Sequence, residues 1–211
     1  MTPMTPQQIY EQSFRQIRQG LTTLNCSDEE RHIIERVIHA TADWEYRDTM
    51  QFHPQALNAG IEAITRNIPI ITDVHMVQVG FNRTMMTSLG LKSFCYVDHT
   101  HADTMAQKFG ITRSAWGIRH AFDVHGNAAI VVIANAPTAL LETLRLIDEK
   151  GWTPHLVIGV PVGFVMAKES KELLAQQQKI PFVTNLSLKG GSPVGAAIVN
   201  AFMTLVDKKG L

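Results

Sequence analysis

Five short apolar segments, separated by segments with helical patterning, constrain the fold more than any other feature of the sequence. Each segment is almost continuously aliphatic or aromatic, which is typical of a strand that is buried on both faces. Such strands, alternating with helices, form a parallel sheet that is covered by helices on both faces. The predicted strands are residues 69–72, 93–97, 128–133, 156–160 and 181–184. The predicted intervening helices are residues 74–88, 100–121, 137–150, 166–178 and 193–206.

Three further helices are predicted before the first of these strands. Residues 5–20 begin with Thr-Pro and end in Gly, and residues 27–41 begin with a capping box, which are strong helix signals. A third helix is predicted for residues 54–67, beginning at a proline. The chain has 211 residues without a repeat or an obvious linker. We therefore predict one α/β domain, residues 1–211, in which N-terminal helices precede a mostly parallel sheet of about five strands.

Composition excludes several classes of protein. The 19 basic and 19 acidic residues cancel and no basic block is present, so a nucleic-acid partner is not expected. The apolar runs around Ile130 and Val157 are too short to span a bilayer. The first residues lack the apolar stretch of a signal peptide. Cys26 and Cys95 have neither metal-ligand nor disulfide spacing. We expect a cytoplasmic protein that binds neither nucleic acid nor membrane.

Polar or turn-forming residues follow every predicted strand. They are Asp73 and His75, then Asp98, then Asn135, Pro137 and Thr138, then Pro161 and Gly163, then Gly190, Gly191 and Ser192. Ligands of open parallel sheets bind at the carboxyl ends of the strands. The sequence thus predicts a binding site at one edge of the sheet.

His39 is the sharpest catalytic candidate. It lies in the last turn of the helix predicted for residues 27–41, where the helix dipole favours a protonated imidazole by at most about 2 kcal/mol. That effect predicts a pKa raised by roughly one to one and a half units, suitable for an acid or a hydrogen-bond donor. Arg36, three residues earlier, shares its face of the helix. Position alone favours another interpretation, a histidine that caps the terminal carbonyls.

Two loops and one arginine are candidate anion-binding elements. Residues 135–138 and 189–192 each precede a predicted helix, and the amides at a helix start bind carboxylates or phosphates. Arg113 lies in the first turn of a helix, where a cation opposes the dipole, so a role as a carboxylate clamp gains weight. A plain turn and a surface arginine remain the structural alternatives.

The sequence offers weaker support for two other functions, a metal-dependent hydrolase and a nucleotide-binding protein. His99 and His101 form a His-x-His pair after a predicted strand, which occurs in metal-dependent hydrolases. No third histidine stands at a recognisable spacing, and zinc needs at least three protein ligands. A nucleotide-binding protein is disfavoured because no Gly-x-Gly-x-x-Gly or Walker pattern follows any predicted strand.

Four segments in this order resemble the precorrin-8X methylmutase family of corrin biosynthesis. They are Arg36–Asp43, Ala134–Leu140, Gly159–Ser170 with the following Lys171, and Lys189–Ser192. The resemblance extends from about Ile9 to Val206. It implies an isomerase that moves a methyl group from C11 to C12 of precorrin-8X, or cobalt-precorrin-8, giving hydrogenobyrinic or cobyrinic acid in cobalamin biosynthesis. It implies no cofactor, because the methyl group stays in the molecule.

The same resemblance implies the site and its partners. The substrate is an anionic tetrapyrrole, and the protein is expected to be a homodimer with sites near the subunit interface. His39 corresponds to the catalytic residue, as a proton or hydrogen-bond donor. Phe164 and Val165 are expected to face the ring, and Ser170 or Lys171 to contact substrate. The implied substrate-binding residues are Ser13, Arg36, Arg113, Asn135, Thr138, Gly163, Ser170, Lys189, Gly190, Gly191 and Ser192. The main alternative is a tetrapyrrole carrier that performs no chemistry.

Overall fold

A computed structural model of the protein, which describes residues 3–209, contains one six-stranded sheet with the order β1-β6-β5-β4-β2-β3. Five neighbouring strands are parallel, as the sequence predicts. They are β2 (Ile70–Thr72), β3 (Ser93–Cys95), β4 (Ile130–Ile133), β5 (Leu156–Gly159) and β6 (Phe182–Asn185). The sixth, β1 (Met50–Phe52), adds an antiparallel edge to β6 and was not predicted. Its three residues contain no apolar run, so the pairing with β6 alone defines it.

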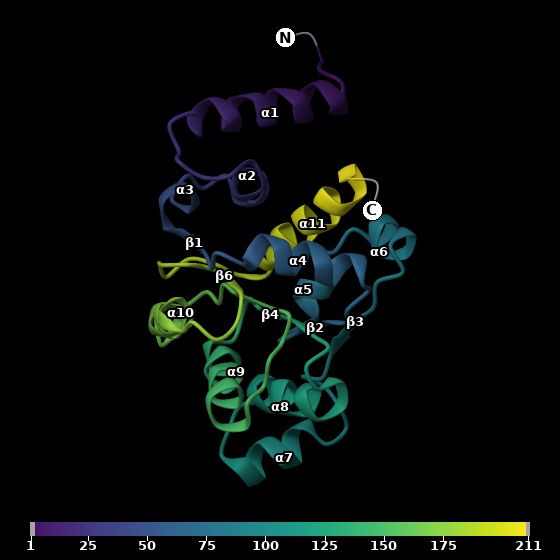
Figure 1. The fold of residues 1–211 in the computed structure, drawn as a ribbon, viewed down its shortest axis with the longest axis vertical. Helices are drawn as coiled ribbons and strands as arrows, with labels where there is room; N and C mark the ends of the chain where they lie inside the picture. Colours follow the sequence, from purple (N-terminus) through teal and green to yellow (C-terminus); the bar gives the residue numbers. More distant parts are fainter. Residues whose placement is uncertain (1–2, 210–211) are drawn as a thin grey trace.

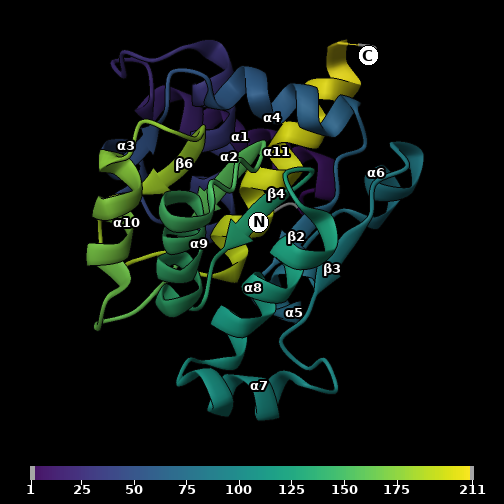
Figure 2. The same cartoon turned by 60° about the horizontal axis from the view of Figure 1, so that its bottom comes forward.

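Helices cover both faces of the sheet (Figures 1 and 2). The helices on one face are α2 (Asp28–Thr41), α4 (Ala56–Thr65), α5 (His75–Val79) and α11 (Ser192–Lys209). Those on the other face are α8 (Arg113–His125), α9 (Pro137–Lys150) and α10 (Ala167–Gln176). Successive strand residues serve opposite faces, because side chains alternate along a strand. Val132 and Ile158 pack toward α11, whereas Val131 and Val157 pack toward α8 and α9.

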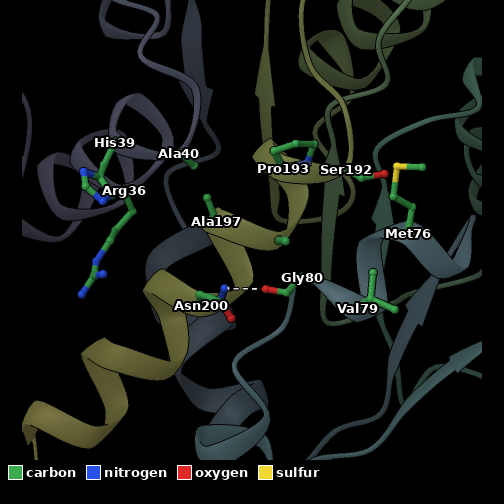
Figure 3. A pocket seen from close by; sticks show the side chains of 11 residues that line it. Arg36, His39, Ala40, Met76, Val79, Gly80, Ser192, Pro193, Ala197 and Asn200 are labelled. Carbon is green, nitrogen blue, oxygen red and sulfur yellow. Dashed lines mark hydrogen bonds between the residues drawn. The ribbon is translucent and has the colours of Figure 1, made fainter. Parts of the chain in front are cut away.

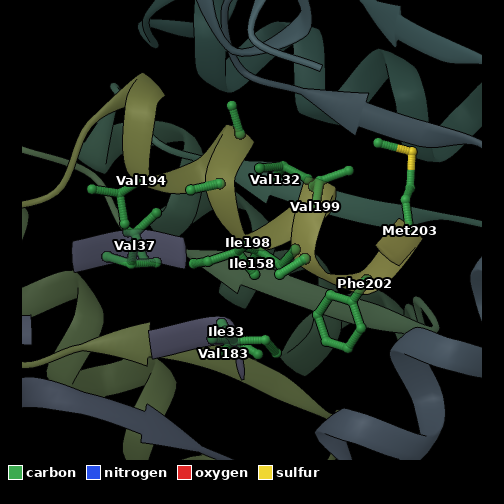
Figure 4. Close-up of a cluster of buried hydrophobic side chains, with 14 of the residues drawn as sticks. Ile33, Val37, Val132, Ile158, Val183, Val194, Ile198, Val199, Phe202 and Met203 are labelled. Atoms are coloured by element: carbon green, nitrogen blue, oxygen red, sulfur yellow. The ribbon is translucent and has the colours of Figure 1, made fainter. Parts of the chain in front are cut away.

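The larger core joins α11 and α2 to the sheet. Figure 4 shows Ile198 of α11 beside Val37 of α2 and Ile158 of β5. All three side chains are fully buried. Because interiors of this kind are close-packed, the N-terminal half of α11 and the C-terminal half of α2 are held in one fixed relation.

Both predicted N-terminal caps are confirmed. α1 (Pro6–Gly20) and α2 each begin with a complete capping box, at Thr5 and Ser27. α1 lies outside the two helical layers, against α2 (Figure 1). The predicted helix at residues 54–67 corresponds to α4, and a short helix, α3 (Tyr46–Thr49), precedes β1.

Two of the predicted long helices are each divided, so those predictions were wrong in length. Residues 74–88 form α5 and α6 (Arg83–Ser88), because the Asn82 side chain accepts from Met85 N–H and starts a new helix. Residues 100–121 fall in α7 (Ala102–Phe109) and α8, because Gly110 is left-handed and Thr112 caps α8. The predictions for α9, α10 and α11 are confirmed, although α11 continues to Lys209.

The described residues form a single α/β domain; the predicted limits at residues 1 and 211 lie outside them. Within residues 3–209, no helix combines the length and apolar character needed to cross a membrane.

Candidate active site

A cavity of about 440 Å³ opens between α2, α5 and α11 (Figure 3). Its walls at α5 and α11 begin just beyond the ends of β2 and β6, at the predicted edge of the sheet. Arg36, His39 and Ser192 line it together, although 153 residues separate His39 from Ser192. The other lining residues are Ala40, Met76, Val79, Gly80, Pro193, Ala196, Ala197 and Asn200.

The floor of the cavity is a face of α11, of which the sequence predicted Ser192 but not Ala196 or Asn200. Ser192, Ala196 and Asn200 recur at intervals of four residues and so share this face. Asn200 Nδ2 donates to Gly80 O at 2.9 Å (Figure 3). Asn82 N–H donates to Asn200 Oδ1 at 2.9 Å. This amide therefore fixes the end of α5 against α11. The available signal was a stripe of small and polar residues along an otherwise apolar helix.

Arg36 presents a buried donor with no protein partner to this cavity. Its guanidinium carbon lies 5.1 Å from the centre of the Phe14 ring and 6.0 Å from that of Tyr10. These cation–π contacts orient the side chain. Arg36 Nε is buried and makes no hydrogen bond to the protein. A buried donor of this kind requires an acceptor, and a carboxylate suits a guanidinium best.

His39 lies beside the same aromatic residues of α1. Its ring centre is 4.5 Å from that of Phe14 and 5.7 Å from that of Tyr10. Partial burial, followed by the charge of Arg36, lowers the pKa of His39 below its ordinary value. The predicted increase from the helix dipole was therefore wrong in direction. A neutral imidazole, with one N–H donor, predominates at neutral pH.

The capping interpretation of His39 loses its main support. Two carbonyls near the end of α2 already have other donors, because Thr41 Oγ1 donates to Val37 O at 2.8 Å and Ala42 N–H donates to Ile38 O at 2.8 Å. The imidazole is left to face the cavity.

Ser192 supplies a second unpartnered group. The residue is only 5% exposed, yet its Oγ makes no hydrogen bond to the protein. The two glycines before it have positive φ, 157° at Gly190 and 108° at Gly191. A Cβ at Gly190 would collide with the carbonyl oxygen atoms of Val160 and Pro161. The glycines thus allow the close approach that places Ser192 at the cavity.

The sequence and the fold are both similar to those of known proteins. The family model for precorrin-8X methylmutase matches residues 8–205. The cobalt-precorrin-8 methylmutase of Priestia megaterium is 44% identical over 207 residues, 97% of this chain and 91% of its own. The precorrin-8X methylmutase of Pseudomonas aeruginosa is 36% identical, with 94% and 95% covered. A crystal structure of the Thermus thermophilus precorrin-8X methylmutase superposes with a TM-score of 0.88 at 32% identity, covering 97% of this chain and 98% of the other.

The chain belongs to the precorrin-8X methylmutase family. Members of this family are isomerases that catalyse an intramolecular methyl shift. The α/β fold and the resemblance stated from the sequence are confirmed.

Lys189 does not present a free cation to the cavity. Its Nζ lies 2.6 Å from Asp43 Oδ2 and 2.8 Å from Glu45 Oε2. The hydrogen bonds that Lys189 donates to these carboxylates raise its pKa above the ordinary value. Lys189, which the sequence suggested as a substrate contact, instead connects the β6–α11 loop to the segment after α2.

The loop after β4 is also occupied from within the protein. The amides of Ala134, Asn135 and Ala136 donate to the carboxylate of Asp73 at 3.2, 2.8 and 2.7 Å. Burial raises the pKa of Asp73, and the three amides oppose that shift. The expectation that these amides are exposed for a substrate carboxylate is corrected, because Asp73 already fills their positions. Thr138 Oγ1 is hydrogen-bonded to Thr112 Oγ1 at 2.8 Å.

Six other predicted site residues also lie outside the cavity lining, including Gly190 and Gly191, which directly precede Ser192. Ser13 Oγ donates to Ile9 O at 2.8 Å within α1, and Arg113 Nε lies 3.6 Å from Asp103 Oδ1. Gly163 N–H donates to Leu188 O at 3.1 Å. Ser170 is fully buried and donates to Ala167 O, so its hydroxyl is not available to a substrate in this structure.

Apolar side chains surround the cavity mouth and extend beyond it. Met76 and Val79 on its rim are 67% and 69% exposed. Phe164 and Val165, in the loop after β5, are 90% and 78% exposed. The segment after β5 lies against the cavity end of α11, because Gly191 N–H donates to Val160 O at 2.9 Å. A site with a few buried polar groups and an apolar border suits a ligand with acidic substituents on an apolar ring.

The histidines considered for a hydrolase do not form a metal site. The ring centres of His99 and His101 are 5.5 Å apart. Throughout residues 3–209, no group of three or more His, Cys, Asp or Glu residues could hold a metal ion. The hydrolase alternative thus lacks a ligand set.

Proposed function

We propose that this chain moves a methyl group from C11 to C12 of precorrin-8X or cobalt-precorrin-8 in corrin biosynthesis. The observation that carries the proposal is the convergence of Arg36, His39 and Ser192 on one cavity. Within residues 3–209, three buried side-chain nitrogen or oxygen atoms lack a hydrogen-bond partner, and two of them, Arg36 Nε and Ser192 Oγ, belong to this cavity. Buried polar atoms without partners are rare in proteins, so their coincidence supports a ligand site.

The proposed substrate is an anionic tetrapyrrole that carries several carboxylates. Arg36 binds one carboxylate, and a charge-assisted hydrogen bond of this kind contributes about 1.5–3 kcal/mol. Ser192 donates a second, weaker hydrogen bond to the substrate. Met76 and Val79 pack against the apolar ring, and Phe164 and Val165 extend that contact. The ring is thereby held while the methyl group migrates.

His39 is the proposed catalytic residue. Its lowered pKa supports a neutral imidazole that donates an N–H hydrogen bond to the ring-C nitrogen. As the bond from the methyl carbon to C11 breaks, the bond to C12 forms, so no atom enters or leaves the molecule. The hydrogen bond draws electron density from the migration terminus during this exchange. A positioned donor of this kind typically contributes about 10²- to 10⁴-fold in rate.

We also propose that the protein is a cytoplasmic homodimer. The cavity of about 440 Å³ is in the lower part of the usual range of about 300–1,000 Å³ for ligand sites, and a substituted macrocycle is a large ligand. Tyr10 and Ile9 of α1, next to the His39 side of the cavity, are 44% and 54% exposed. A second chain would cover such surface. Light scattering should give twice the 23.5 kDa chain mass.

The proposed cytoplasmic location is supported by the free thiols of Cys26 and Cys95, which suit a reducing compartment.

Visible absorption after mixing with each substrate tests the proposed activity. Moving the methyl group from C11 adds that carbon to the conjugated path, so isomerisation changes the spectrum with time at a rate proportional to enzyme. We expect His39→Ala to bind substrate and to lose about 10²- to 10⁴-fold in kcat. An immediate stoichiometric change without turnover would instead identify a carrier. Full activity in His39→Ala would contradict the catalytic assignment.

A further inference from the structure

Lys171 is a fully buried lysine that the proposed chemistry does not use. It lies in α10, on the opposite side of the sheet from most of the cavity wall, and is 0% exposed. A buried ammonium is costly unless its protons are bonded. Burial lowers the pKa of Lys171 to about 8, so the side chain is mostly charged at neutral pH. A charge kept in such a position requires a structural or functional reason.

The ammonium binds the backbone of the loop between β6 and α11. Lys171 Nζ donates to Lys189 O at 2.6 Å and to Asn185 Oδ1 at 3.4 Å. Asn185 Nδ2 donates to the same carbonyl at 2.9 Å, and Lys189 N–H donates to Ser187 Oγ at 3.1 Å. The carbonyl of Lys189 is therefore the point at which Lys171 and Asn185 hold the loop.

The side chain of Lys189 holds the same residue to the segment that follows α2. Lys189 Nζ binds Asp43 and Glu45, which follow the last turn of α2, where His39 lies. Glu45 also acts on Lys171, where its negative charge favours the ammonium. The other ionisable group in this cluster is Tyr46, whose pKa is raised to about 12 mainly by burial, so it stays neutral.

Both ends of this connection lead to the cavity. From Lys189 the chain passes through Gly190 and Gly191 to Ser192, and from Asp43 it returns within four residues to His39. Lys171 contacts neither cavity residue. It can act on the site only by holding the backbone that joins the two walls.

We propose that Lys171 is a positioning residue: its buried ammonium fixes the Lys189 carbonyl, and through Lys189 it sets the position of Ser192 relative to His39. The inference rests on the proposed function for its effect on turnover. Its effect on the loop is independent of that function. A displacement of about 1 Å in a catalytic arrangement can reduce the rate about 10²-fold.

The test compares Lys171→Met with Lys168→Met, which removes an exposed lysine from the same helix. Turnover and substrate affinity are measured on the full-length protein with precorrin-8X and with cobalt-precorrin-8. In Lys171→Met we expect kcat to fall about tenfold to 100-fold. Affinity should fall no more than about tenfold, the limit set by losing the Ser192 hydrogen bond, because Arg36 is intact. Lys168→Met keeps wild-type values. Wild-type kcat in Lys171→Met, or an equal loss in Lys168→Met, would overturn the proposal.

Hydrogen–deuterium exchange of residues 186–195 separates this inference from the proposed function. We expect these amides to exchange at least about tenfold faster in Lys171→Met than in the wild type, with the core strands unchanged. Unchanged exchange overturns the positioning role even if neither substrate is turned over. Faster exchange in an enzyme without methylmutase activity contradicts the proposed function and leaves the loop role supported.

A second variant covers the case in which Lys171→Met does not fold. Lys189→Met removes the exposed half of the same connection, and it should also accelerate exchange and lower kcat. Where both single variants fold, the double variant should lose no more kcat than the worse single variant, because both break one connection. Multiplicative losses, or a Lys189→Met protein with wild-type exchange and kcat, would refute the coupling.

Discussion

Two loops at the carboxyl edge of the sheet begin helices in similar ways but have opposite local chemistry. After β4, the amides of Ala134, Asn135 and Ala136 surround the carboxylate of Asp73. After β6, the loop ends at Ser192, whose buried hydroxyl has no protein partner. The donors of the first loop are satisfied within the protein, whereas the second loop leaves the Ser192 hydroxyl available to the proposed substrate.

The difference shows that an amide-rich helix start does not by itself identify an anion site. The dipole and the amides favour any anion, and the chain can provide one. What distinguishes the β6 side is the presence of Ser192 and Arg36, two buried donors without acceptors around the same cavity. Four substitutions or measurements can break or sharpen this contrast.

The largest effect, on the free energy of unfolding, is expected when the carboxylate that binds the amides of the β4 loop is removed. Asp73→Ala leaves three amides without their acceptor, so we expect a loss of about 3 kcal/mol or more in the free energy of unfolding. Urea denaturation measures it. Asp98→Ala, which removes an exposed carboxylate after the neighbouring strand, is the matched control and should cost under about 1 kcal/mol. Equal stability of the two variants would show that Asp73 does not hold this loop.

The next effect is on substrate affinity at the open side. Arg36→Met keeps the apolar stem against Phe14 but removes the charge, so we expect affinity to fall about tenfold to 100-fold. Spectroscopic titration measures it. Arg113→Met removes a cation on the β4 side that already lies near Asp103, and should change affinity less than about twofold. A comparable loss in Arg113→Met would mean that the site extends beyond this cavity, in one chain or across a dimer.

The contrast also explains what the sequence could and could not predict. The five parallel strands and the caps of α1 and α2 are local patterns, and they were predicted correctly. Asp73 and Asn135 are 62 residues apart, so the filling of the β4 loop is a tertiary event without a local signal. The same holds for Lys189, because its bonds to Asp43 and Glu45 span the fold.

Prediction of the site failed where burial decided the outcome. The position of His39 at the end of α2 gave the sign of the dipole effect, but the packing of α1 against it reversed the pKa shift. Ser170 looked like other loop-adjacent serines, yet it faces the interior. The stripe of small and polar residues on α11 was a weak signal, because it forms a cavity wall only where α5 lies beside it.

Two buried serines provide a smaller and closely matched contrast. Ser192→Ala removes an unpartnered hydroxyl, so the free energy of unfolding should stay within about 0.5 kcal/mol or rise slightly, while substrate affinity falls about twofold to tenfold. Ser170→Ala removes a hydroxyl bonded to Ala167 O, so stability should fall by about 1 kcal/mol with affinity unchanged. Thermal unfolding and titration of both variants measure these effects. The reverse pattern would place the ligand at Ser170.

The smallest expected effect concerns pH and tests the protonation state of His39. Its pKa is lowered by burial and by Arg36. In the folded protein His39 therefore binds fewer protons than in the unfolded chain, and its contribution to stability is lost as pH falls through the window below the ordinary histidine pKa. If the neutral imidazole is the donor, kcat/KM should fall below that window and stay within about twofold between pH 6.5 and 7.5. A decrease of kcat/KM as the pH rises from 6.5 to 7.5, absent in His39→Gln, would instead identify an imidazolium acid whose pKa in the free enzyme is not lowered.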